Sequence, residues 1–177
     1  DFDIVEIPDF EWRVANYGIA KAVGNSILAR RLKYNMETDI WLPIGLYYHN
    51  SFDILPPRIY AEEHPDWYSG LAKYDDGSYI ISSGQLCYSN EEMRLQLVEN
   101  LKNYIINNPG IENVTVTQQD NTDWCTCDEC KASYNKYGTN SAVVIKCMNK
   151  VHADIESWMA NQGYDWKLDI AFFAYNP

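Results

Sequence analysis

The sequence predicts an α/β fold, because short apolar segments typical of strands alternate with longer segments that show helical periodicity. This alternation is typical of βα units, in which the strands lie parallel in one sheet. Five strands linked in this way fit either an open doubly wound sheet or part of a (β/α)8 barrel. No glycine-rich phosphate loop follows any of them, which disfavours a nucleotide-binding fold. The five predicted strands lie near residues 10–14, 43–48, 85–88, 114–118 and 168–174.

The first two predicted strands are separated by a predicted helix at residues 20–33. This segment carries apolar side chains at helical spacing and basic side chains late, where the helix dipole favours cations. The second strand ends at His49, and a long loop rich in Pro, Tyr, Asp and Gly follows from Pro56 to about Ser83. Loops of this length inside a compact domain are usually functional.

The helix before the fourth strand has recognisable signals at both of its ends. Ser89 and Glu92 form the pattern of a capping box, and an apolar stripe follows them. Asn108 and the Pro-Gly pair after it stop the helix.

The last helix is predicted over residues 141–159 and ends near Gly163. Cys147 lies on its apolar stripe, so we expect it in the core. The chain then closes on the fifth apolar strand, with no initiator Met and no signal peptide at its start. We therefore expect residues 1–177 to be a single partial domain, truncated at its C-terminus.

Composition describes a folded protein with an acidic surface. The apolar fraction is 46%, and 25 acidic residues exceed 14 basic ones, for a formal charge of −11. A nucleic-acid backbone or an anionic membrane surface would be repelled by this charge. No apolar run approaches the ~20 residues that a membrane-spanning helix needs.

Three cysteines in six residues, Cys125, Cys127 and Cys130, follow the fourth predicted strand. Cys87 lies at the end of the third strand, close enough to supply a fourth thiolate for a tetrahedral structural zinc site. Four thiolates leave no open position, so a catalytic zinc is disfavoured. Disulfides, which suit an exported protein, and buried free thiols are the alternatives.

Asp120 and Asn121 lie between the fourth strand and the cysteines. Glycoside cleavage needs a carboxylic acid that protonates the leaving oxygen, and an N-acetyl sugar can use its own acetamide as the nucleophile. An Asp-Asn pair at a strand end could supply the acid and orient the amide. The alternative is a turn in which these side chains bond their own backbone.

Other strand-end side chains are candidates for binding a sugar. His49 could donate to a sugar hydroxyl, and Arg13 could reach the same edge of the sheet. Trp124 and Tyr175 lie just beyond strand ends, where aromatic rings offer flat faces to sugar C–H groups. Core packing is the alternative for each aromatic, and a satisfied buried histidine is the alternative for His49.

Six motifs occur in an order that resembles the domain of unknown function 4838, whose characterised members form glycoside hydrolase family 163. The resemblance spans nearly the whole chain. The motifs are Pro8-Asp9-Phe10-Glu11-Trp12-Arg13, the His49 strand end, His64-Pro65-Asp66-Trp67-Tyr68, Gln85-Leu86-Cys87-Tyr88-Ser89-Asn90, Gln119-Asp120-Asn121 with the three cysteines, and Ala171 to Tyr175.

The resemblance implies a (β/α)8 barrel and an endo-β-N-acetylglucosaminidase that acts on complex N-glycans. This chain would supply the first five βα units of that TIM-type barrel. An oligosaccharide or a glycoprotein glycan would be its partner, and we expect the parent protein to be secreted, periplasmic or on the surface of a bacterium. A non-catalytic carbohydrate-binding domain and a zinc-stabilised interaction module are the alternatives.

Overall fold

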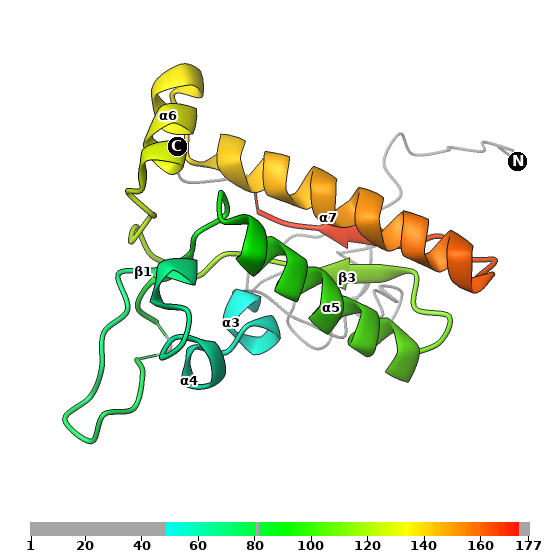
Figure 1. Cartoon of the computed structure of the whole chain (residues 1–177), viewed down its shortest axis with the longest axis horizontal. Helices are drawn as coiled ribbons and strands as arrows, with labels where there is room; N and C mark the ends of the chain where they lie inside the picture. The colour runs from blue at the N-terminus through cyan, green and yellow to red at the C-terminus, as the bar shows by residue number, and fades with distance from the viewer. Residues whose placement is uncertain (1–48, 81, 174–177) are drawn as a thin grey trace, which may run out of the picture. The chain divides into compact units, whose positions relative to one another are not determined.

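A pair of parallel strands and two long helices form the part of the fold that positions the site (Figure 1). The computed structural model describes residues 49–80 and 82–173, which belong to one compact unit, Pro43–Pro177. Strand β3 (Asn113–Thr115) pairs in parallel with β4 (Asp169–Ala171). The predicted parallel pairing of the fourth and fifth strands is therefore confirmed.

Helices α5 (Glu91–Asn107) and α7 (Ser141–Gln162) lie side by side along these strands (Figure 1). Each turns one apolar stripe inward, at the spacing that the sequence predicts. Full burial of each large side chain stabilises the fold by ~1.5–3 kcal/mol relative to exposure. The buried stripes are Met93, Leu97, Leu101 and Ile105 on α5, and Val144, Cys147, Met148, Val151 and Ile155 on α7.

The N-terminus of α5 begins one residue later than the capping pattern predicts. Asn90 is the N-cap, and its Oδ1 accepts a hydrogen bond from the backbone N of Met93 at 2.9 Å. The predicted capping box at Ser89 is thus wrong, because the Ser89 hydroxyl lies against cysteine sulfurs instead. The predicted helix ends are confirmed at Asn108 and at Gly163, which adopts φ 75°.

The predicted third strand does not join the parallel pair. Strand β2 (Gln85–Leu86) pairs antiparallel with β1 (Tyr68–Ser69), so its predicted parallel orientation is wrong. The segment after the second predicted strand lies beside residues 113–117 instead of β2, since the backbone N of Ser51 donates to the carbonyl of Thr117 at 3.0 Å. A short apolar run does not reveal the direction in which its strand will pair.

Several short elements fall in segments that the sequence analysis treated as loop. Four-residue helical turns carry too little periodicity to be recognised, and the longer helix among them, α6, buries only Cys130 and Ser133. These elements are α3 (Ser51–Ile54), α4 (Pro57–Tyr60), the 3-10 turn η1 (Pro65–Trp67) and α6 (Asp128–Tyr137).

The described strands form two separate two-stranded sheets, neither of which closes on itself. The mixed α/β class is therefore confirmed, while closure into a (β/α)8 barrel stays a prediction. The strands predicted near residues 10–14 and 43–48, and the helix predicted at 20–33, lie outside the described residues. No helix in the described part of the chain is both long and apolar enough to cross a membrane.

Gly84, directly before β2, allows the two sides of the β1–β2 ribbon to approach each other closely. Its φ is +84°, and an added Cβ would lie 2.6 Å from the backbone oxygen of Ser69. Gly77 has the same φ, but an added Cβ would meet nothing within 4 Å. We expect Gly77→Ala to cost about 1 kcal/mol of unfolding free energy from backbone strain alone. Gly84→Ala should cost about 3 kcal/mol or more, because a steric clash adds to that strain.

Urea unfolding of the two variants measures this difference, and Gly77→Ala is the matched control. Equal losses in the two variants would show that the close approach at Gly84 contributes nothing.

Candidate metal centre and the adjoining polar site

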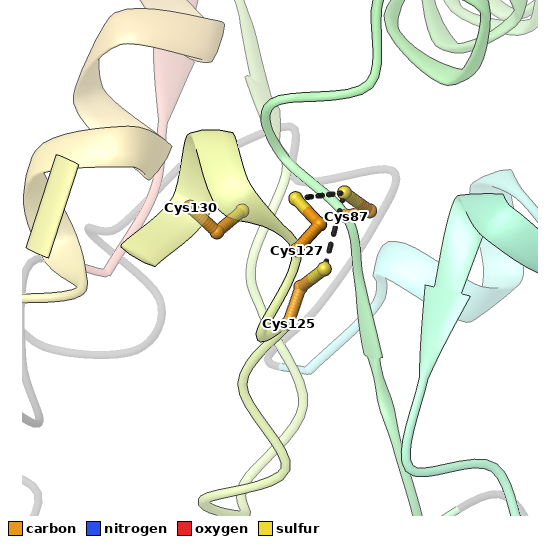
Figure 2. A group of neighbouring side chains, drawn as sticks. All are labelled: Cys87, Cys125, Cys127 and Cys130. Atoms are coloured by element: carbon orange, nitrogen blue, oxygen red, sulfur yellow. Dashed lines mark hydrogen bonds between the residues drawn. The ribbon is translucent and has the colours of Figure 1, made fainter. Parts of the chain in front are cut away.

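Four cysteines from two distant segments converge on one point (Figure 2). Cys87 directly follows β2 and continues the ribbon, since its backbone N donates to the carbonyl of Trp67 at 2.8 Å. Cys125 and Cys127 lie in the loop after β3, and Cys130 lies in the first turn of α6. The predicted convergence of these four residues is confirmed.

The spacing of the four sulfurs suits a tetrahedral metal ion. All four lie within 4.8 Å of one another, and the Sγ of Cys87 lies 3.3 Å from that of Cys125 and 3.8 Å from that of Cys127. A tetrahedral zinc ion with Zn–S bonds of ~2.3 Å requires sulfurs ~3.8 Å apart. The four thiols are therefore placed as a complete ligand set that needs only small adjustments.

All five cysteines of the chain are free thiols in this structure. The sulfur separations above are far longer than the ~2.05 Å of a disulfide bond. Cys147, the fifth cysteine, is buried in the α7 stripe, as expected. The geometry thus favours metal ligation over disulfides. It also favours metal ligation over buried free thiols, because core packing does not require four thiols at one point.

Hydrogen bonds among the thiols separate their pKa values. Donation from Cys125 lowers the pKa of the Cys87 thiol to about 2, whereas hydrogen bonds with Cys125 and Cys87 raise the pKa of Cys130. The Ser89 hydroxyl lies 3.2 Å from the sulfur of Cys127 and 3.1 Å from that of Cys130. It can donate to a thiolate, which is the usual role of a residue just outside a metal's ligand shell.

Gln85 joins the ribbon to the start of the loop that carries Asp120. Its fully buried side chain acts like a strand backbone toward Gln119: Oε1 accepts from the backbone N at 3.1 Å, and Nε2 donates to the carbonyl at 2.7 Å. This pairing satisfies the buried backbone N–H of Gln119 and adds a second donor to its carbonyl, which also accepts from the backbone N of Asn121 at 2.9 Å. The sequence analysis missed this role.

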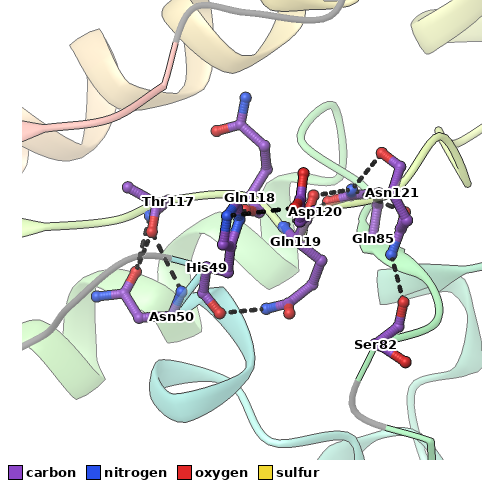
Figure 3. A network of polar contacts seen from close by, with 9 residues as sticks. All are labelled: His49, Asn50, Ser82, Gln85, Thr117, Gln118, Gln119, Asp120 and Asn121. Carbon is purple, nitrogen blue, oxygen red and sulfur yellow. Dashed lines mark hydrogen bonds and ion pairs between the residues drawn. The ribbon is translucent and has the colours of Figure 1, made fainter. Parts of the chain in front are cut away.

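The side chain of Asn121 contacts the same Gln85 amide and the ribbon beside it (Figure 3). Its Oδ1 accepts from Nε2 of Gln85 at 2.9 Å and from the backbone N of Asp123 at 3.0 Å. Its Nδ2 donates to the carbonyls of Ser82 and Gly84 at 3.0 and 2.9 Å. Every hydrogen-bonding position of this amide is therefore engaged in holding the loop.

His49 lies at the end of the second predicted strand with an unusual backbone. Its φ is 57°, and in the described part of the chain no other residue apart from glycine has a positive φ. Its Nδ1 lies 2.8 Å from the carbonyl of Gln118, which can only accept, so Nδ1 carries the proton. The ring also packs against Phe173, with centroids 5.3 Å apart.

Asp120 faces His49 across the strand ends (Figure 3). The Oδ2 of Asp120 lies 3.9 Å from the Nε2 of His49, and the carboxylate side chain is 72% exposed. The structure therefore brings together these two predicted site residues. It places Asn121 beside them as part of the support for the loop.

The other predicted sugar-binding residues are not brought into this group. Trp124 is half-buried and packs against the core, directly before Cys125. Arg13 and Tyr175 lie outside the described residues. Their roles stay predictions.

Asn50 is a further residue that the sequence analysis did not identify. Its buried amide bonds the edge of β3, where Oδ1 accepts from the backbone N of Thr117 and Nδ2 donates to the carbonyl of Thr115, both at 2.8 Å. One signal was available, since Asn50 and Gln119 occur where a predicted strand ends and Gln85 occurs where one begins. Buried amides at such points usually satisfy backbone groups of neighbouring strands.

Replacing Gln85 tests how strongly the loop is held. Gln85→Leu would leave the buried N–H of Gln119 without its acceptor, while the Gln119 carbonyl would keep the backbone N of Asn121. We therefore expect a loss of roughly 1–3 kcal/mol in unfolding free energy. Gln162→Leu, at the exposed C-terminal end of α7, is the matched control and should change stability by less than about 0.5 kcal/mol. Urea titration of both variants would measure the losses, and a small effect at Gln85 would contradict its proposed role in holding the loop.

The fold and the site together define a mixed α/β protein with a four-cysteine cluster at the edge of a parallel strand pair. The family described as "Domain of unknown function (DUF4838)" matches residues 1–165, and the chain belongs to that family. No curated protein and no solved structure matches the chain.

Proposed function

We propose that this chain is the N-terminal part of a (β/α)8 glycoside hydrolase acting on glycans that contain N-acetylglucosamine. The observation that carries the proposal is the approach of Asp120 to His49, with 3.9 Å between Oδ2 and Nε2, beyond the carboxyl end of β3. In barrel enzymes the catalytic residues come from the carboxyl ends of the strands. The family membership is compatible with this activity.

The order of the described segments is compatible with the proposed barrel if one change is made to the sequence prediction. The segment around Ser51, residues 113–119 and β4 follow one another as neighbours, linked by the Ser51–Thr117 bond and the β3–β4 pairing. Strand β2 belongs to the long excursion between residues 49 and 90. We therefore propose four βα units in this chain, with the ribbon as an insertion beside the mouth of the barrel.

In this proposal Asp120 protonates the leaving oxygen or orients the acetamide of the substrate. His49, whose Nδ1 proton is held by the Gln118 carbonyl, presents Nε2 to a sugar hydroxyl. The positive φ of His49 supports a functional role, because strained backbone conformations concentrate at functional sites. Arg13, Trp124 and Tyr175 are proposed to bind the remaining sugar surface.

Asn121 takes a different role from the one first expected. Its amide already makes four hydrogen bonds to the loop and the ribbon, so it is proposed to position Asp120 and not to contact the acetamide. A positioning residue of this kind acts by limiting the motion of its neighbour.

We assign a structural zinc ion to Cys87, Cys125, Cys127 and Cys130. Four converging thiols are the donor set that zinc prefers in closed structural sites. The ion would join the ribbon to the loop that carries Asp120, next to the hydrogen bonds of Gln85 and Asn121. It would supply a crosslink and take no part in the reaction.

The second candidate is a non-catalytic carbohydrate-binding domain. The exposure of Asp120 favours it, because an acid catalyst usually sits in a more enclosed site that raises its pKa. The exported bacterial location expected from the resemblance is part of both proposals.

The test is incubation of the full-length protein with a glycopeptide whose glycan is attached through two N-acetylglucosamine residues. Mass spectrometry should detect a released glycan and a peptide that retains one N-acetylglucosamine. Binding of the glycopeptide without release would favour the second candidate, and neither binding nor release would contradict both.

A further inference from the structure

A cavity in the described part of the chain shares no residue with the His49–Asp120 pair or with the four clustered cysteines. Residues of α3, of α4 and of the segments that follow each helix line one side of it, and Lys73 with residues 77–79 lines the other. Its volume is ≈ 660 Å³, within the ~300–1,000 Å³ typical of small-molecule sites. The long segment after the second predicted strand therefore builds a concave surface of its own.

The floor of this cavity is apolar and rigid. Phe52, Pro56, Pro57 and Ala61 line it, and all four are buried. Two consecutive prolines restrict the backbone at this point, and Pro57 begins α4 where a proline is well tolerated. A ligand that displaces water from this floor gains apolar contact without having to order the backbone.

The opening carries two charges of each sign. Asp53, Arg58, Glu62 and Lys73 line the cavity and are exposed. Within the described residues, none of the four forms an ion pair with another side chain. The two basic side chains can donate hydrogen bonds and the two carboxylates can accept them. The cavity therefore suits a ligand that has both hydrogen-bond donors and acceptors.

Tyr79 supplies an aromatic wall. It pairs with Lys73 across an isolated antiparallel bridge, and the Lys73 Nζ lies 4.6 Å from the centre of the Tyr79 ring. The turn between them is closed by Asp76, whose Oδ1 accepts from the backbone N of Ser78 at 2.9 Å. Tyr79 also packs against the hydrophobic core, which limits the motion of its ring.

We infer that this cavity binds a neutral, hydroxyl-rich oligosaccharide. A sugar ring has an apolar C–H face for the floor and Tyr79, and each hydroxyl can donate to Asp53 or Glu62 while accepting from Arg58 or Lys73. An anionic ligand would meet both carboxylates and a chain of net charge −11, and a cationic ligand would meet Arg58 and Lys73. The choice of a glycan as the ligand rests on the proposed function. The inference adds a second sugar-binding site to it.

The experiment is isothermal titration of the full-length protein with the neutral trisaccharide of β-1,4-linked N-acetylglucosamine. Glu62→Gln should raise the Kd by roughly tenfold, because it removes a charged acceptor from the cavity. Glu63→Gln is the matched control, since Glu63 is the exposed neighbouring residue and does not line the cavity. Tyr79→Ala should abolish binding, with Tyr74→Ala, on the same hairpin, as its control.

Thermal melting of each variant checks folding, and Glu62→Gln gives an answer even if Tyr79→Ala fails to fold. Equal affinities of the Glu62 and Glu63 variants would overturn the inference, as would absence of binding to the wild type. If binding is lost in His49→Ala but kept in Glu62→Gln, the sugar binds only at the strand ends, so the inference fails and the proposed function stands. Binding that depends on Glu62 without any glycan release supports the inference and rejects the catalytic proposal.

Discussion

Asp120→Asn in the full-length protein should lower kcat on a glycan containing N-acetylglucosamine by about 10²-fold or more. The substitution keeps the shape of the side chain and removes the ability to exchange a proton. KM should change little, because the carboxylate is proposed to act on the transition state and not on the bound ground state. Steady-state kinetics on a defined glycopeptide would measure both constants.

Asp123→Asn is the control for this variant, because Asp123 lies on the same loop but serves a different purpose. Its Oδ2 accepts from the backbone N of Gly84 at 2.9 Å, which holds the loop against the ribbon. We expect this variant to be less stable and to keep a kcat within a few-fold of wild type. Wild-type turnover in Asp120→Asn would move the catalytic role to other residues of the protein.

Removal of the metal should produce the largest change in stability. We expect one zinc ion per chain by elemental analysis, and we expect a strong chelator to lower the Tm. A ligand present at 1,000 times its Kd stabilises the folded state by about 4 kcal/mol, so a loss of at least this order is expected. Cys125→Ser should abolish zinc binding, because a hydroxyl is a poor ligand for zinc in a thiolate site.

Cys147→Ala is the matched control for the cysteine variant, since Cys147 is buried on α7 and outside the cluster. It should retain one zinc ion and lose only about 1 kcal/mol of stability from reduced packing. Four titratable thiols without bound metal would favour the free-thiol alternative for the cluster. Loss of thiol titre without bound metal would show disulfides instead.

The zinc site and the polar contacts of the loop act on the same segment. Cys87 and Gln85 reach it from one strand of the ribbon, and Asp123 accepts the Ser69 hydroxyl through its carbonyl at 2.6 Å. Loss of zinc should therefore leave the loop attached but less constrained. This arrangement explains why a structural ion would lie next to a site that needs a precisely placed carboxylate.

Patterns within single segments were sufficient to predict the main elements. The apolar stripes of residues 91–107 and 141–162 made both helices recognisable, because helical periodicity is a local property. The parallel relation of β3 and β4 followed from the helix between them, since a helical crossover returns the chain in the same direction. The density of cysteines predicted a cluster, and Cys87 was assigned to it as the end of a neighbouring parallel strand. The four residues do converge, although Cys87 follows a strand of the separate antiparallel ribbon.

The tertiary structure decided the features that depend on contacts between distant residues. The antiparallel direction of β2 comes from its pairing with Tyr68–Ser69, which no local pattern of the Gln85 segment reveals. From the sequence, the Asn121 amide could bind either a substrate or its own loop. Its hydrogen bonds with Gln85 and with the carbonyls of Ser82 and Gly84 show that it holds the loop. An amide has the same hydrogen-bonding groups in both roles, so only its neighbours in space determine which one it performs.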